Sequence, residues 1–568
     1  MLARLLPAAL AATLWVAAPV QAAGPGQGAV ASAHPEATAA GERILAAGGN
    51  AFDAAVAVTA ALGVVEPYGS GLGGGGFFLL FEAENDRSVM LDARETAPGE
   101  AHRDMYLDDD GEVVEGLSLD GVLAAGIPGM PAGLDHLSRQ YGSLALGDTL
   151  EPAIRLAEDG VEVGGRYNQM ASFRHRALRN GADAAQIFLD NGAVPDAGMR
   201  LVQPDLADTL RRLAEEGRDG FYTGALAERL VDGVREAGGI WTLDDLADYE
   251  VVERDPIHIE YRGARITTAS PPSSGGVALG QILNILSFYD LDELAPDLRA
   301  HLSIEAMRRA YRDRAEYLGD PDHVDMPLER LLSRDYAAGL RATIHPDEAT
   351  PSRYLPLSVD PQADVPDPAQ AAESPETTHF SVIDADGNRV AATLTLNYPF
   401  GSGYVVPGTG VLLNNEMDDF SAKPGEPNAY GLIGFEANAI APYRRPLSSM
   451  SPTFVETDDR VAILGTPGGS RIITVVLHGL LGVVEGLDAE AIVEQPRYHH
   501  QYLPDRVEHE TSAFDMETRG QLVARGHRLV PQVRPFGDMQ AILWHRDDGR
   551  LEAASDPRGE GGARVLSE

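Results

Sequence analysis

A proline-rich segment that runs directly into a β-hairpin is the feature that most restricts the fold of this chain. Between Thr350 and Glu376 the sequence has several acidic residues and prolines at positions 351, 356, 361, 366, 368 and 375. We expect an irregular, exposed segment here. TTHFSVID and VAATLTLN follow as two alternating strands joined by DADGN, and its Asp-Gly pair is typical of a hairpin turn.

The hairpin predicts which residues meet. A turn centred near Asp386 and Gly387 places Thr395 opposite the start of the first strand, within a residue or two of Thr377. A threonine at such a junction is usually only a strand former. Here, however, attack of the Thr377 hydroxyl on the carbonyl of Glu376 would give an ester, whose hydrolysis makes Thr377 a new N-terminus. Its α-amine, with a reference pKa of about 7.7 to 8.0, suits a general base.

Composition and charge exclude several classes of protein. The 568 residues are 44% apolar and 23% charged, which is ordinary for a globular chain, and there is no cysteine. Disulfides, thiol nucleophiles and thiolate metal sites are therefore excluded, and a covalent catalyst must be Ser, Thr or Lys. A net charge of -41 argues against nucleic acid and anionic membranes as partners.

Residues 1–22 have the pattern of a secretory signal peptide. They combine a basic start at Arg4, an apolar middle, and small residues placed for cleavage after Ala22. The alternative is an N-terminal membrane anchor, but the apolar stretch is short and contains a proline. We therefore expect a periplasmic or secreted protein without stable membrane insertion.

Two other motifs favour structural roles. Residues 41–65 are typical of one helix of small residues, and the glycines that follow it precede a buried strand. Gly71, Gly73 and Gly76 match G-x-G-x-x-G, but a dinucleotide site needs the order strand, glycines, helix. Close backbone packing is expected instead. His499 and His500 are adjacent and would point to opposite faces of a strand, so we expect no metal there and no cofactor.

Several longer motifs carry a family resemblance. ETTHFSVIDADGN, LNNEMDDFSAKPG, RRPLSSMSPT and GTPGGSRI together resemble the γ-glutamyltranspeptidases, also called γ-glutamyltransferases. DAAVAV, GLGGGGF, LDARETAP, PPSSGG, YLGDPD, RYHHQYLPD and SDPR extend the resemblance over nearly the whole mature chain. It implies an α+β N-terminal-nucleophile hydrolase fold, a four-layer αββα sandwich. It also implies autocatalytic cleavage between Glu376 and Thr377, giving a large subunit (23–376) and a small subunit (377–568).

The resemblance further implies roles for individual residues. Thr377 would be the nucleophile, Thr395 would hold its hydroxyl, and Gly468 and Gly469 would form the oxyanion hole. The substrate residues would be Arg94, Ser448 and Ser449 for an α-carboxylate, Asn397, Glu416 and Asp419 for an α-ammonium, and Tyr430 as the cap in a lid loop of residues 421–439. Opposite charges held a few ångströms apart suit a γ-glutamyl donor.

The activity implied is that of a self-processing γ-glutamyltransferase and glutathione hydrolase. It would cleave γ-glutamyl amides such as glutathione or glutamine through a γ-glutamyl-Thr377 ester, and pass the acyl group to water or to an amino-acid or peptide acceptor. One alternative is a glutaryl or cephalosporin-type acylase of the same fold, although such relatives tend to lose the carboxylate that Asp419 provides. Another is a non-enzymatic acidic binding protein of the cell envelope, which would remain one chain.

Overall fold

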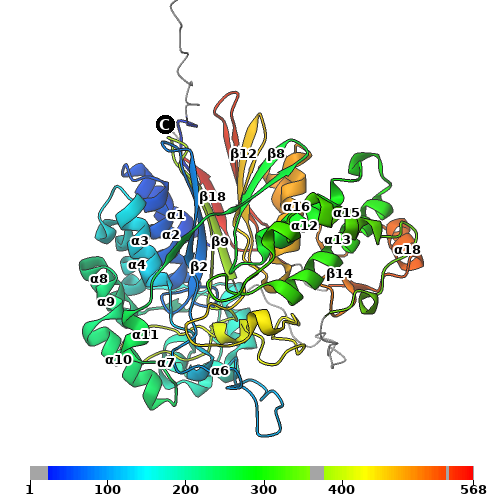
Figure 1. The fold of residues 1–568 in the computed structure, drawn as a ribbon. Helices are drawn as coiled ribbons and strands as arrows, with labels where there is room; N and C mark the ends of the chain where they lie inside the picture. The colour runs from blue at the N-terminus through cyan, green and yellow to red at the C-terminus, as the bar shows by residue number, and fades with distance from the viewer. Residues whose placement is uncertain (1–23, 358–376, 533–535, 567–568) are drawn as a thin grey trace, which may run out of the picture.

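The computed structural model of the protein describes residues 24–357, 377–532 and 536–566. The predicted signal peptide and Glu376, at the predicted cleavage site, lie outside these residues. Two β-sheets stack face to face, and helices cover the outer face of each sheet (Figure 1). The predicted four-layer αββα sandwich of the α+β class is therefore confirmed.

Seven strands of the described chain form the first sheet, with the predicted hairpin at its centre. From edge to edge they are β18 (Gly562–Val565), β1 (Ala29–Ser32), β9 (Thr377–Ile383), β10 (Arg389–Thr395), β2 (Gly75–Glu82), β3 (Arg87–Ala93) and β6 (Val252–Arg254). All neighbours are antiparallel. Strands from before and after the predicted cleavage site thus share this sheet.

Six strands of the described chain form the second sheet. They are, in order, β17 (Leu551–Ser555), β16 (Gln540–His545), β12 (Arg460–Gly465), β11 (Thr453–Glu456), β8 (Ala264–Thr268) and β7 (Ile257–Tyr261). The inner faces of the two sheets touch directly. Ser381 on β9 donates hydrogen bonds to the carbonyls of Ile463 (3.3 Å) and Gln540 (3.2 Å) in the second sheet.

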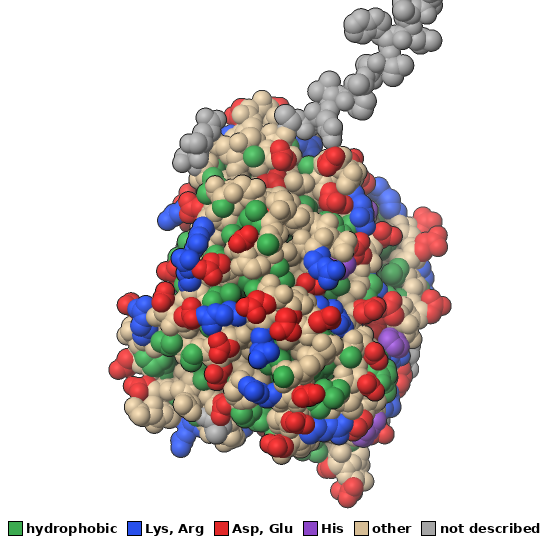
Figure 2. All heavy atoms as spheres, turned by 90° about the vertical axis from the view of Figure 1, so that its left-hand side faces the viewer, with side chains coloured by type: hydrophobic (Ala, Val, Ile, Leu, Met, Phe, Trp, Pro, Cys, Tyr) green, Lys and Arg blue, Asp and Glu red, His purple; other side chains and the backbone are tan. Residues whose placement is uncertain are grey.

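Each outer helical layer packs an apolar face on its sheet. The layer on the first sheet contains α1 (Pro35–Ala46), α2 (Ala51–Val65), α3 (Met130–Tyr141), α4 (Leu146–Asp159), α8 (Pro204–Glu216) and α10 (Gly224–Glu236). The layer on the second contains α12 (Gly275–Leu286), α13 (Pro296–Tyr317), α16 (Ile472–Val484) and α17 (Ala489–Glu494). On the face formed by the first layer, acidic side chains are spread among basic ones (Figure 2).

The predicted single helix over residues 41–65 is wrong. The structure has α1 and α2 separated by a turn at residues 47–50, in which Gly48 has a φ of +90°. Asn50 then caps α2, because its side chain accepts from the backbone of Phe52 and Asp53 while the Asp53 carboxylate accepts from Asn50 N. This capping box starts a new helix where the run of small residues suggested continuity.

Two of the three glycines around the start of β2 have the packing role that the sequence predicted. A Cβ on Gly73 would lie 2.0 Å from the carbonyl oxygen of Leu412, and one on Gly76 would lie 2.7 Å from that of Thr393. Gly71 has no such neighbour within 3.9 Å. Close approach of backbone to backbone therefore explains two of the three glycines in the G-x-G-x-x-G match.

Shorter elements complete the described chain. The remaining helices are α5 (Gly165–Phe173), α6 (His175–Asn180), α7 (Ala182–Phe188), α9 (Asp219–Tyr222), α11 (Leu243–Ala247), α14 (Leu328–Leu331), α15 (Arg334–Ala342) and α18 (Met516–Ala524). The small sheets contain β4 (Val161–Glu162), β5 (Arg200–Leu201), β13 (Tyr498–His499), β14 (Val507–His509) and β15 (Leu529–Pro531). Among the described residues, every helix is too short or too polar to cross a membrane.

Candidate active site

Thr377 opens strand β9 at the point where the described chain resumes. The hairpin register places it directly opposite Thr395, the last residue of β10. Their hydroxyl oxygens lie 3.5 Å apart, and both side chains are buried. The predicted proximity of these two threonines is therefore confirmed by the strand pairing.

The Thr395 hydroxyl is oriented by the turn that follows it. Thr395 Oγ1 accepts a hydrogen bond of 2.7 Å from the backbone N–H of Asn397. Asn397 has a φ of +73°, a left-handed conformation that asparagine adopts more readily than most residues, and its Nδ2 donates to the Asn415 carbonyl at 2.9 Å. This bond uses one lone pair of Thr395 Oγ1 and leaves its hydrogen for a bond with Thr377 Oγ1, in which either oxygen could donate.

Gly468 and Gly469 form the turn that precedes α16. Their φ angles of +134° and +52° lie in the region that favours glycine, and a Cβ on Gly469 would lie 2.6 Å from the ring of Tyr430. Backbone N–H groups at the start of a helix lack partners within that helix. The turn therefore presents backbone donors where a side chain would obstruct access.

A cavity collects the side chains that the sequence singled out. It is lined by Arg94, Thr377, Thr395, Asn397, Glu416, Asp419, Tyr430, Leu432, Ser448, Ser449, Met450, Gly469 and Ile472. Of the predicted catalytic and substrate residues within the described chain, only Gly468 is outside this lining, next to Gly469. The cavity volume is about 20 Å³, which holds little more than a water molecule.

The charged end of the cavity is internally paired. The Arg94 guanidinium forms ion pairs with Glu416 and, at 2.6 Å, with Asp419, while Arg94 Nε donates to the Pro446 carbonyl at 3.1 Å. Arg94 and Glu416 are both 1% exposed. The side chain predicted to bind a carboxylate therefore holds two of the side chains predicted to bind an ammonium.

Glu95 is a buried charge next to this cluster that sequence reasoning did not assign. Its side chain is fully buried, its Oε2 lies 3.8 Å from Arg94 Nη1, and both its carboxylate oxygens lack a hydrogen-bond partner among the described residues. Burial raises the pKa of Glu95 to about 7, and burial also raises the pKa of Glu416 well above its usual value. The only signal in the sequence was its place after Arg94 in LDARETAP.

Ser448 and Ser449 lie on a segment fixed by strand-like bonds. The Ser448 N–H donates to the Pro272 carbonyl at 2.8 Å, and the Ser274 N–H donates to the Ser448 carbonyl at 2.8 Å. Ser448 Oγ accepts from the backbone of Met450 at 3.1 Å. The PPSSGG motif, far away in sequence, thus holds in place the part of PLSSMSP that lines the cavity.

Tyr430 lines the cavity and belongs to the predicted lid loop, residues 421–439. Its hydroxyl donates to the Asn397 carbonyl at 2.6 Å, and its own carbonyl accepts from Gln501 Nε2 at 3.1 Å. Asn428, in the same loop, donates to Asp419 at 3.2 Å. The lid is therefore bonded to both the threonine end and the charged end.

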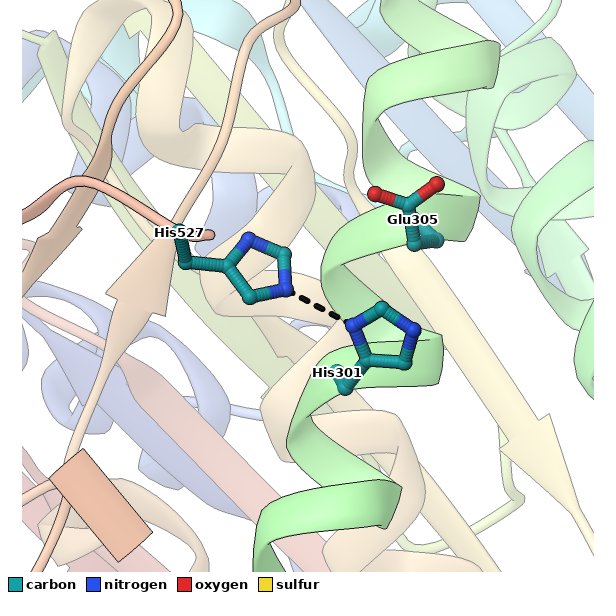
Figure 3. Close-up of side chains that lie close together, drawn as sticks. All are labelled: His301, Glu305 and His527. Atoms are coloured by element: carbon teal, nitrogen blue, oxygen red, sulfur yellow. Dashed lines mark hydrogen bonds between the residues drawn. The ribbon is translucent and has the colours of Figure 1, made fainter. Parts of the chain in front are cut away.

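The described residues contain one group of side chains that could bind a metal ion, and none of its members lines the cavity. His301, Glu305 and His527 point toward one another (Figure 3), and their ligand atoms lie within 4.8 Å. However, His301 Nδ1 and His527 Nε2 are bonded to each other at 2.8 Å, and Glu305 accepts from Arg309 at 2.6 Å. The donor set is occupied by internal bonds, so we assign no metal to it.

The adjacent histidines also have structural partners. His499 bonds Thr474 and Gln501, each at 2.9 Å, and His500 bonds Asp505 at 3.3 Å. Burial lowers the pKa of His499 to about 3 and that of His500 to about 4, so both rings are neutral at pH 7. They belong to the core rather than to the cavity.

The αββα layers place this protein among the N-terminal-nucleophile hydrolases. A family model described as gamma-glutamyltranspeptidase matches residues 37–566. The chain therefore belongs to the gamma-glutamyltranspeptidase family, whose members are enzymes, and the resemblance drawn from the motifs is confirmed.

Individual relatives agree with this assignment. The chain is 43% identical over 545 residues to a glutathione hydrolase proenzyme from a Pseudomonas species, covering 94% of this chain and 92% of the relative. It is also 43% identical over 538 residues to the glutathione hydrolase proenzyme of Escherichia coli, covering 94% and 90%. Among solved structures, cephalosporin acylase from Bacillus halodurans superposes with a TM-score of 0.81 at 28% identity, covering 95% of both chains.

Proposed function

We propose that the protein is a self-processing γ-glutamyltransferase and hydrolase that acts on γ-glutamyl amides such as glutathione or glutamine. The observation that carries the proposal is the single cavity in which the Thr377–Thr395 pair faces Arg94, Glu416 and Asp419. A γ-glutamyl group has a reactive carbonyl at one end and a zwitterion at the other. Its chemistry corresponds to that of the two ends, since the hydroxyls lie near one end and the Arg94, Glu416 and Asp419 charges lie at the other.

Processing would begin with the Thr377 hydroxyl. Its oxygen attacks the carbonyl carbon of Glu376, the peptide C–N bond breaks, and the nitrogen of Thr377 takes the proton as it becomes an amine. Water then hydrolyses the resulting ester, releasing the carboxylate of residue 376 and regenerating the hydroxyl. The large subunit would comprise residues 23–376 and the small subunit residues 377–568.

Turnover would use the same hydroxyl with the new α-amine as base. The amine accepts the hydroxyl proton while Thr377 Oγ1 attacks the γ-carbonyl of the donor, and the backbone N–H groups of Gly468 and Gly469 stabilise the oxyanion. The proton passes to the leaving amine, and a γ-glutamyl ester remains on Thr377. Water or the amine of an amino acid or peptide then attacks this ester.

Donor binding would exchange ion pairs within the cavity. The α-carboxylate of the donor takes the place of Glu416 and Asp419 on Arg94, with Ser448 and Ser449 donating to the same carboxylate. The released carboxylates, together with Asn397, then hold the α-ammonium. Since the exchange replaces internal charge pairs by equivalent ones, the buried charge stays balanced.

The closed cavity requires a movement before the donor enters. Its volume of about 20 Å³ is far below that of a glutamyl group, and Tyr430 covers it. We propose that the lid loop opens by breaking the bond from Tyr430 to the Asn397 carbonyl.

We also propose that residues 1–22 direct export of the enzyme to the periplasm or out of the cell.

A second candidate function is an acylase for glutaryl or cephalosporin-type amides. This candidate is supported by the similarity in structure to cephalosporin acylase, which has a TM-score of 0.81. Asp419, however, supplies a carboxylate that a glutaryl group, lacking an ammonium, would leave unpaired. A non-enzymatic binding protein of the cell envelope would have no use for the threonine pair.

Two measurements test the proposal together. N-terminal analysis of purified protein should find a fragment beginning at Thr377, and a γ-glutamyl anilide should be cleaved faster than the matched glutaryl anilide. The reverse preference would assign the acylase function. A single uncut chain without activity on either anilide would exclude both enzyme functions and favour the non-enzymatic binding protein.

A further inference from the structure

Arg314 on helix α13 is a buried cation without a carboxylate partner. It is 6% exposed, and within the described part of the chain it makes no ion pair, although burial lowers its pKa by disfavouring the charge. By contrast, Arg308 and Arg309 on the same helix both pair with Glu305. A buried guanidinium left without an anion is costly, so its retention needs a reason.

The hydrogen bonds of Arg314 lead to the wall of the cavity. Its Nε donates to Ser274 Oγ at 3.0 Å, and its Nη2 donates to Ser449 Oγ at 3.4 Å. Ser274 Oγ in turn donates to the Ser448 carbonyl at 2.6 Å. One guanidinium therefore reaches the side chain of Ser449 directly and the backbone of Ser448 through Ser274.

Arg314 also lies beside the charged end of the cavity. It lines a neighbouring hollow with Asp419, which lines the main cavity as well. Arg94 is already paired with Glu416 and Asp419. These two carboxylates partly neutralise its charge, so it attracts an incoming carboxylate less strongly. Arg314 is a second cation at this end whose charge is not offset by a direct partner.

We propose that Arg314 is a positioning residue that sets how the cavity recognises the donor's α-carboxylate; this rests on the proposed function. When Arg314 N–H donates to Ser449 Oγ, the Ser449 hydroxyl hydrogen is directed away from the guanidinium and toward the cavity. It then points where a carboxylate oxygen needs a donor. The positive charge behind the serine strengthens that hydrogen bond.

The test compares two anilides on processed enzyme. The γ-glutamyl anilide carries the α-carboxylate, whereas 4-aminobutanoyl anilide keeps the amine and the amide but lacks that carboxylate. Arg314→Met should raise KM for the γ-glutamyl anilide by about 10- to 100-fold, the range of a lost charged hydrogen bond, with little change in kcat. It should change kcat/KM for 4-aminobutanoyl anilide by less than about twofold.

Matched variants separate positioning from support of the fold. Arg309→Met removes a guanidinium from the same helix that reaches no cavity residue, so any loss should be equal for the two anilides. Arg314→Lys keeps the charge but not the forked geometry, and should raise KM for the γ-glutamyl anilide alone by several-fold. This variant carries the test if Arg314→Met fails to fold.

A double-mutant cycle gives the decisive outcome. Because Arg314 acts through Ser449, Ser449→Ala should cost little more once Arg314→Met is present. Equal losses for both anilides, or fully additive effects of the two substitutions, would overturn the proposal. If the wild-type enzyme does not cleave γ-glutamyl anilide, the proposed function itself would be refuted.

Discussion

The two ends of the cavity are built in different ways. The threonine end comes from adjacent strands of one hairpin, is uncharged, and has Thr377 directly opposite Thr395. The charged end brings together Arg94, the turn at 416–419 and the segment at 448–449, and Arg94 there is already paired with Glu416 and Asp419. The first end needs only local pairing to form, whereas the second needs the whole sandwich.

In the proposed mechanism, the threonine end carries out the reaction and the charged end recognises the donor. The threonine end serves any reaction that needs the hydroxyl, which includes both processing and turnover in the proposed mechanism. In the same proposed mechanism, the charged end would contact only the bound donor. Substitutions at the first end should therefore affect both reactions, and substitutions at the second should affect turnover alone.

Thr377→Ala should have the largest effect, because it removes the hydroxyl that both reactions need. We expect a single unprocessed chain without detectable activity, measured by gel electrophoresis and anilide hydrolysis. Thr377→Ser is the matched control, since it keeps a hydroxyl and should process and turn over more slowly. Activity in an uncut Thr377→Ala protein would contradict the mechanism.

Asp419→Asn should be selective for the donor. Loss of one partner of a buried charge pair costs roughly 2 to 5 kcal/mol, which lowers kcat/KM for a γ-glutamyl anilide by tens to thousands of fold. Autocleavage should survive because it involves no donor ammonium. The measurements are kcat/KM and fragment yield on wild type and variant.

A glutaryl anilide supplies the control for Asp419. It lacks the ammonium, so the substitution should cost it little or should help by removing an unpaired carboxylate from its path. Equal losses for the γ-glutamyl and glutaryl anilides would mean that Asp419 supports the fold or the chemistry instead of reading the ammonium.

Thr395→Ala should have a smaller effect that is shared by both reactions. The neutral hydrogen bond that it removes is worth about 0.5 to 1.5 kcal/mol, so processing and turnover should each slow by up to about tenfold. A time course of fragment formation and kcat for γ-glutamyl anilide would measure this. Wild-type rates in both assays would show that the 3.5 Å contact between the two threonines has no catalytic role.

Glu95→Gln should give the smallest effect, seen mainly in the pH dependence. Because the pKa of Glu95 is raised to about 7, its carboxyl is largely neutral below that pH and ionised above it. Ionisation adds a negative charge beside Arg94 and weakens the attraction of Arg94 for the donor's α-carboxylate. In wild type, KM for the γ-glutamyl anilide should rise by a few fold from pH 6 to 8, and Glu95→Gln should remove this rise.

The sequence predicted the threonine end closely because a hairpin is a local structure. The Asp-Gly turn determined the pairing, and Thr395 lies opposite Thr377 as expected. Both predicted strands are present, and the polar residues in their alternating pattern are buried as well, since every residue of β9 and β10 is buried. These strands lie between a helical layer and the second sheet, and Ser381 on the polar face of β9 bonds carbonyls of that sheet.

The charged end was less predictable for the same physical reason. Motifs indicated Arg94, Glu416 and Asp419 one by one, but no spacing in the chain predicts that they pair with one another. Glu95 and Arg314 carry no pattern of their own, and their importance depends on burial and on neighbours far away in sequence. The break between α1 and α2 was missed because small residues continue on both sides of it, although Gly48, Gly49 and the capping residue Asn50 are typical of a helix boundary.

The mixed origin of both sheets has a consequence for how such a protein can be encoded. β9, β10 and β18 lie among strands from the first part of the chain, while β7 and β8 extend a sheet from the last part. Two separately translated polypeptides would each expose strand edges that invite aggregation before they met. If the chain is cut as proposed, and only after the sheets have closed, a single reading frame keeps those edges paired from the start and encodes both fragments together.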